Sequence, residues 1–78
     1  SNKRKVKNNM TESIELLVVE NYNLFGEEVY KCDSEIQAFR KYKELKGCKK
    51  NIFRAKVFWQ NLMKVPFIMK YEVLEIIV

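Results

Sequence analysis

Apolar and polar residues alternate most regularly in the stretch NIFRAKVFWQNL, which runs from Asn51 to Leu62. Its odd positions share an apolar character and are Phe53, Ala55, Val57 and Trp59. Its even positions are polar apart from one aromatic and are Arg54, Lys56, Phe58 and Gln60. A period of two is typical of a β-strand with one buried face. The pattern therefore predicts a strand over Ile52–Leu62 with an apolar face and a basic face.

Two strands are expected before this one. Ser13–Asn23 is rich in β-branched and aromatic residues, and Leu17 and Val19 make its middle apolar on both sides. The letters NLFGE then predict a turn, in which Gly26 supplies the positive φ of a hairpin bulge. Glu28–Cys32 is expected to be a short returning strand.

A last strand is expected over Phe67–Ile77. Its odd positions begin with Phe67, Met69, Tyr71 and Val73, which form an apolar face. Pro66 cannot donate to a sheet ladder and so marks a turn or a strand start. A helix over Tyr71–Val78 is the alternative, because Glu and Leu favour helices.

The segment Ser34–Lys46 predicts the one helix. Ser34 and Gln37 match a capping box, and Gly47 is placed as a C-terminal stop. The apolar positions recur at helical spacing and are Ala38, Phe39, Tyr42 and Leu45, with Ile36 at the border.

This order predicts an α+β fold: a single four-stranded, mostly antiparallel sheet with one helix on one face (β-β-α-β-β). Residues 1–9 are expected to be a flexible basic tail, and residues 10–78 a single small domain. The helix is expected to cover the face that carries Phe53, Val57, Trp59, Met69 and Tyr71. The other face would then carry Arg54, Lys56, Phe58, Gln60, Lys70 and Glu72.

The net charge of +5 is unevenly distributed. The tail contributes +4, so the remainder carries only +1, with acids gathered in residues 10–36 and bases in residues 39–70. Such a dipolar domain can steer an anionic partner or pair head to tail. Lysine and asparagine are abundant and arginine is scarce, which suits a small accessory or regulatory protein of a phage, mobile element or AT-rich bacterium. The absence of a long apolar run or a secretory pattern indicates a cytoplasmic protein with no membrane partner.

Catalysis finds little support in the sequence. Histidine is absent, and two glycines cannot form a phosphate-binding loop. We therefore expect no enzyme activity, no catalytic residues, no cofactor and no small-molecule substrate. Cys32 and Cys48 flank the helix, which holds them too far apart for a disulfide. Without histidine they do not form a standard zinc site, so we expect free thiols and no metal.

Two functions remain. The first is a binding module that acts by protein–protein interaction, with itself as a homodimer or with another protein, through its C-terminal edge strand or outer sheet face. The residues expected to carry self-association are Phe58, Ile68, Leu74, Ile76 and Val78. The alternative is nucleic-acid binding, in which an aromatic stacks on a base and cations contact phosphates. Its candidate residues are Arg40, Lys41, Lys49, Lys50, Arg54, Lys56 and Phe58.

Overall fold

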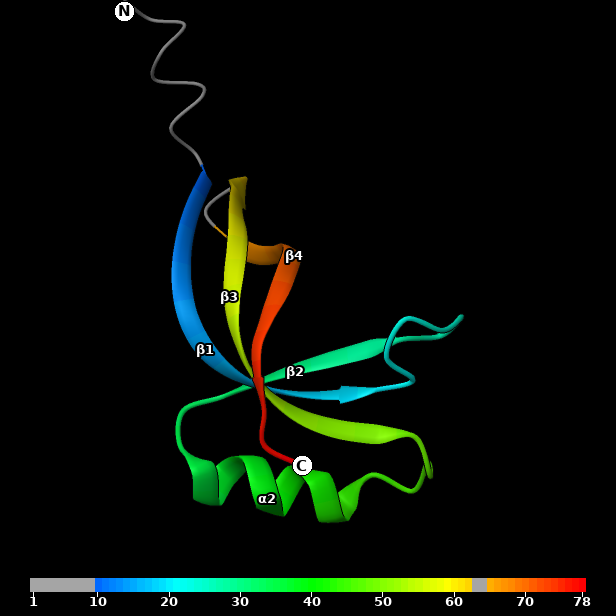
Figure 1. Cartoon of the computed structure of the whole chain (residues 1–78). Helices are drawn as coiled ribbons and strands as arrows, with labels where there is room; N and C mark the ends of the chain where they lie inside the picture. The colour runs from blue at the N-terminus through cyan, green and yellow to red at the C-terminus, as the bar shows by residue number, and fades with distance from the viewer. Residues whose placement is uncertain (1–9, 63–64) are drawn as a thin grey trace, which may run out of the picture.

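The computed structural model describes residues 10–62 and 65–78 of the chain, so the predicted tail lies outside the described residues. The elements are β1 (Met10–Glu20), β2 (Glu28–Cys32), α2 (Glu35–Glu44), β3 (Lys50–Leu62) and β4 (Val65–Ile76) (Figure 1). The four strands form one antiparallel sheet in the order β2-β1-β3-β4. The predicted α+β fold with β-β-α-β-β order is confirmed, and the alternative helix at the C-terminus is wrong.

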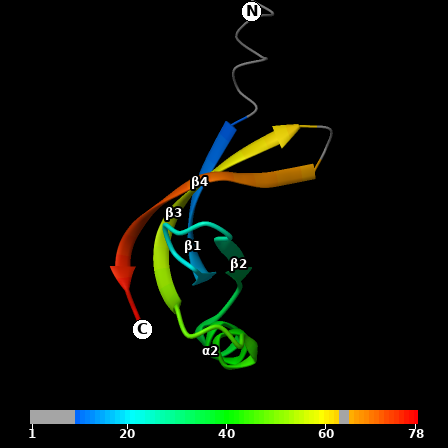
Figure 2. The ribbon, with the colours of Figure 1, turned by 90° about the vertical axis from the view of Figure 1, so that its right-hand side faces the viewer.

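The sheet is strongly twisted and curls around one of its faces (Figures 1 and 2). That concave face holds a core cluster of Leu17, Val19, Phe53, Ala55 and Val57, none of which is more than 1% exposed. Tyr22, in the turn after β1, packs edge-on against the Phe53 ring and also lies beside Tyr71 of β4. The outer parts of the sheet therefore meet over Phe53, and the sheet covers its own core.

The helix lies on the opposite, convex face, which corrects the sequence expectation. Ala38 of α2 is fully buried with Val18, Cys32 and Ile52 in a second core cluster, where Tyr42 packs too. The expected helix stripe included Ile36 and Phe39, but these are 72% and 40% exposed. The alternation of β3 indicates an apolar face that needs cover, and sheet curvature covers that face without the helix.

Helix α2 begins as the sequence predicts and ends differently. The Ser34 Oγ accepts from the Gln37 N–H at 3.2 Å, which confirms the cap. The C-cap is Leu45 rather than a glycine, and the Lys50 ammonium donates to the carbonyls of Tyr42 and Leu45 at 2.7 and 2.8 Å. A cation at this position satisfies free carbonyls and the negative end of the helix dipole.

Gly47 has a different role from the predicted helix stop. Its N–H donates to a Glu20 carboxylate oxygen at 3.2 Å, and an added Cβ would collide with that carboxylate. A larger residue at this position would have to displace the flexible end of the Glu20 side chain, which comes from the last residue of β1. None of the helices in the described part of the chain has the length and apolar character that crossing a membrane requires.

Candidate functional site

Strand β4 forms one edge of the sheet and carries more exposed large apolar side chains than any other described element. Among the residues that the structure describes, it pairs with β3 alone. Exposed apolar side chains follow it from its first residue to the end of the chain, namely Val65, Phe67, Met69, Leu74, Ile76 and Val78. Their exposed fractions run from 40% to 66%. An edge strand with unpaired backbone groups and apolar side chains is a template for pairing with another strand.

Two irregularities divide β4. Its register with β3 shifts between Arg54 and Ala55 and again between Phe58 and Trp59. On β4 these shifts leave Leu74 and Met69 without opposite residues, as in β-bulges. The bulge-free stretch between them is Lys70–Val73.

The bulge at Met69 explains the position of Ile68. The alternation predicted Ile68 on the outer face, with Phe58 and Ile76. In the structure Ile68 is opposite Trp59 and packs against the concave core. One extra residue reverses the alternation, so side chains before the bulge change face. The predicted placement of Ile68 is therefore wrong. The bulge at Leu74 likewise puts Ile76 opposite Phe53, on the concave face, so its predicted placement beside Phe58 is also wrong. Leu74, Ile76 and Val78 are all exposed.

The convex face beyond the helix holds the cations expected for nucleic-acid binding, and carboxylates accompany them. Arg54 lies 3.6 Å from Glu35 of α2 and 3.6 Å from Glu75 of β4. Lys56 lies 3.7 Å from Glu12. Phe58 is half-buried, with the ammonium groups of Lys56 and Lys70 at 5.8 and 4.8 Å from its ring centroid. The structure thus brings Arg54, Lys56 and Phe58 onto one face, where acidic side chains offset much of the charge.

The other four candidate cations lie elsewhere. Lys50 caps the helix, and Lys49 is exposed in the loop before β3. Lys41 lies over the Tyr30 ring at 4.2 Å from its centroid, beside edge strand β2. Arg40 lines a depression with Lys41 that β2 also borders. These positions surround the helix and do not extend the Arg54–Phe58 row.

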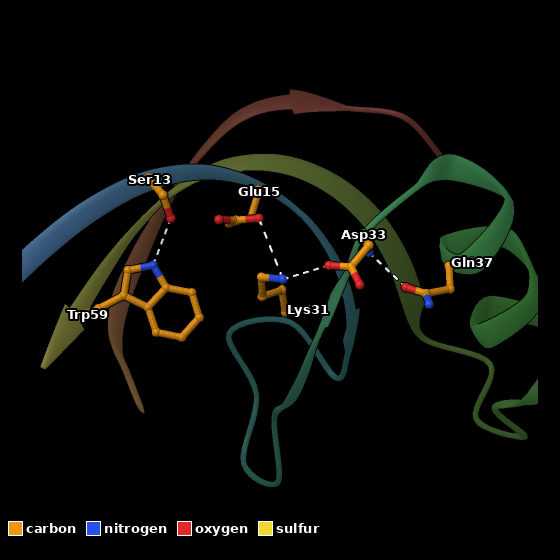
Figure 3. A network of polar contacts seen from close by, with 6 residues as sticks. All are labelled: Ser13, Glu15, Lys31, Asp33, Gln37 and Trp59. Atoms are coloured by element: carbon orange, nitrogen blue, oxygen red, sulfur yellow. Dashed lines mark hydrogen bonds and ion pairs between the residues drawn. The ribbon is translucent and has the colours of Figure 1, made fainter. Parts of the chain in front are cut away.

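The open end of the concave face carries a polar network (Figure 3). The Trp59 indole N–H donates to the Ser13 hydroxyl at 2.7 Å. The Lys31 ammonium donates to Asp33 at 2.8 Å and lies 3.9 Å from Glu15. The hydrogen bond to Asp33 raises the pKa of Lys31 and lowers the pKa of Asp33. Lys31 therefore stays protonated and has no lone pair for nucleophilic chemistry.

A cleft of about 600 Å³ separates the β1–β2 turn from β4. It is bridged by the Tyr71 hydroxyl, which donates to Glu27 at 2.9 Å. Burial, followed by this hydrogen bond, raises the pKa of Tyr71. The same Glu27 oxygen accepts the Asn23 N–H at 2.9 Å. Both polar groups are thus engaged in closing the sheet on itself.

Both cysteines are free thiols, as the helix length between them predicts. Cys32 is buried and Cys48 is exposed. Burial raises the pKa of the Cys32 thiol, which keeps it protonated and unreactive. Residues 10–62 and 65–78 contain no group of three or more acidic, cysteine or histidine side chains arranged to hold a metal ion.

Sequence reasoning missed several exposed apolar residues. Val65, Phe67 and Met69 extend the exposed row of β4 toward its start, and Leu24 and Phe25 stand in the β1–β2 turn. A signal was present in the turn, because NLFG places two large apolar residues where polar ones are usual.

No family model, curated protein or solved structure matches this chain.

Proposed function

We propose that this protein is a small non-enzymatic binding module that pairs with a second copy of itself through edge strand β4. The exposed apolar row on β4 supports this proposal most strongly. Antiparallel pairing of two β4 strands would join the two four-stranded sheets into one continuous sheet. It would satisfy the outward backbone groups of β4 and cover part of its apolar surface.

The bulges restrict the register of this pairing. Regular pairing is easiest in Lys70–Val73, because Met69 and Leu74 interrupt the strand on either side. In a continuous sheet, opposite residues share a face, so a two-fold axis must pass beside one residue. The central residues of the stretch are Tyr71 and Glu72.

Charge selects between these two axes. An axis at Glu72 would place it opposite Glu72 of the partner subunit, which like-charge repulsion disfavours. An axis at Tyr71 places Lys70 opposite the partner's Glu72, and the symmetry creates this pair twice. We therefore propose the register centred on Tyr71.

A charge exchange tests the register. Lys70→Glu puts carboxylates opposite each other twice, so the dimer dissociation constant should rise about tenfold, given roughly 0.5–1 kcal/mol for each cross-strand pair. The double variant Lys70→Glu/Glu72→Lys restores both pairs and should recover most of the wild-type affinity. Sedimentation over a concentration series measures all three constants.

Lys46→Glu is the matched control, because it makes the same charge change at an exposed position just after α2, away from both proposed contacts. Its dimer constant should remain close to that of the wild type. A wild-type chain that stays monomeric throughout the micromolar range would overturn the proposed function. A dimer that responds equally to Lys70→Glu and Lys46→Glu would overturn the register.

Nucleic-acid binding is the second candidate, favoured by Phe58 between two ammonium groups on the face that carries Arg54. The carboxylates within 4 Å of Arg54 and Lys56 weigh against it. Electrophoretic mobility of single- and double-stranded DNA and RNA at about 50 mM salt tests it, because phosphate contacts are strongest at low salt. The absence of any shift there would exclude this candidate.

A further inference from the structure

The β1–β2 turn presents two large apolar side chains at its tip. Phe25 is 105% exposed and Leu24 is 51% exposed. Figure 1 shows this turn projecting on the side of the molecule opposite the start of α2. None of the residues that the structure describes covers Phe25, so packing within this part of the chain gives no reason for a phenylalanine there.

The turn holds this tip in a defined conformation. Asn21, Asn23 and Gly26 all adopt positive φ, at 60°, 60° and 85°. The Leu24 N–H donates to the Asn21 carbonyl at 2.9 Å, and the Glu27 N–H donates to the Leu24 carbonyl at 3.2 Å. A prearranged loop loses little conformational entropy when it binds. The tip is therefore suited to insertion into a pocket.

The exposed side of α2 offers a groove of matching character. It measures about 420 Å³ and is lined by Glu35, Ile36, Phe39, Arg40 and Lys43. Ile36 and Phe39 form an apolar floor, and both are exposed in the single chain. The cations Arg40 and Lys43 stand at its border, while Glu35 is already paired with Arg54.

We propose that the tip of one copy inserts Phe25 into the α2 groove of a second copy, a contact separate from the β4 edge. Charge complementarity supports this occupant: Glu27 and Glu28 follow the tip after Gly26, and Arg40 and Lys43 border the groove. Within one chain the tip and the start of α2 lie on opposite sides (Figure 1), so the contact joins different chains.

This contact is heterologous, because tip and groove are different surfaces. It either closes as a reciprocal pair or ring, or continues head to tail. One exposed tip gives a small interface, so we expect weak association that appears only at high protein concentration.

Complementing variants test the contact in an Ile76→Lys background, which weakens pairing through β4. Phe25→Ser removes the apolar side chain at the tip and leaves the groove unchanged. Ile36→Glu places a charge on the apolar floor of the groove and leaves the tip unchanged. Each should weaken self-association about tenfold, since the main apolar insertion is lost. Both positions are exposed, so both variants are expected to fold.

Mixing the Ile36→Glu and Phe25→Ser chains gives the decisive measurement. Isotope-labelled Ile36→Glu chain is titrated with unlabelled Phe25→Ser chain, and NMR follows the amide signals of residues 21–27. These signals should shift, because the intact tip meets an intact groove, and should not shift on adding unlabelled Ile36→Glu chain. No shift in the first titration, or equal shifts in both, overturns the inference. If β4 pairing itself does not occur, the background substitution is harmless and this readout is unaffected.

Discussion

The two edges of the sheet differ in length, charge and cover. Strand β2 has 5 residues, and Lys31 on it is held by Glu15 and Asp33. Its Tyr30 ring is covered by the Lys41 ammonium of the helix. Strand β4 has 12 residues, and its exposed side chains are mostly apolar. Natural proteins protect edges with short strands and charges. The contrast indicates that β2 is protected against pairing with a further strand, whereas β4 is suited to such pairing.

The largest expected effect is a loss of folding stability on removing the Phe53 ring, which is buried in the concave core. Phe53 is 1% exposed and contacts Tyr22, which in turn lies beside Tyr71 of β4. Phe53→Ala should lower the free energy of unfolding by about 3–5 kcal/mol, because it removes buried area and leaves a cavity. Urea denaturation measures this loss. A loss below about 1 kcal/mol would show that the concave face is not the main core.

A charge placed on β4 should separate association from folding. Ile76→Lys is expected to raise the dimer dissociation constant about tenfold, because a lysine at an edge disfavours pairing. Ile14→Lys is the matched control, since Ile14 is 55% exposed and Ile76 is 66% exposed, but Ile14 lies on an inner strand. Sedimentation should show a raised dimer dissociation constant for Ile76→Lys alone. Equal rises for both variants would contradict a specific role of the β4 edge.

Removing the bridge between β4 and the β1–β2 turn should have a moderate effect. Tyr71→Phe loses the hydrogen bond to Glu27 and should cost about 0.5–1.5 kcal/mol of stability. The raised pKa of Tyr71 means that its contribution is complete below about pH 10, the ordinary tyrosine value, and is lost as pH rises through the folded pKa.

The pH dependence provides a second measurement of this bridge. Ultraviolet titration of the folded protein should show late tyrosine ionisation, and Tyr71→Phe should remove its latest part. Tyr30 accounts for the remainder, because its hydrogen bond to Glu28 also raises its pKa. A titration curve without a late component in the wild type would contradict the bridge.

The smallest effect is expected on the protected edge. Lys31→Met removes the ion pairs with Glu15 and Asp33. These side chains are partly exposed to solvent, so the free energy of unfolding should fall by less than about 1 kcal/mol. Added salt should reduce the difference from the wild type. Thermal denaturation at two salt concentrations checks this, and a large loss that salt does not change would assign Lys31 a packing role.

Local patterns were sufficient to predict the elements, because each depends on neighbouring residues. The Ser34 cap, the Gly26 turn and the strand Glu28–Cys32 appear as the sequence indicates. The C-terminal end of the helix was less predictable, because its cap comes from Lys50 on the following strand.

The face that the helix covers could not be predicted from alternation. Ile52 is buried under α2, and Phe53 is buried under the curled sheet. The curvature of the sheet that buries Phe53 could not be predicted from the sequence pattern. The position of Ile68 was likewise reversed by a bulge at Met69 that no glycine or proline marks. The exposure of the C-terminal part of β4 was predictable from its apolar residues. The exposure of Val65, Phe67 and Met69 was missed, and the register of β4 with β3 depends on these bulges.

Amide hydrogen exchange at dilute and concentrated protein tests the β4 proposal most directly. Strand pairing predicts that the outward amides of Lys70–Val73 become protected as concentration rises, while the amides of Glu28–Cys32 keep the same exchange rate. Exchange that is independent of concentration on both edges, or protection that appears on β2 instead of β4, would contradict it.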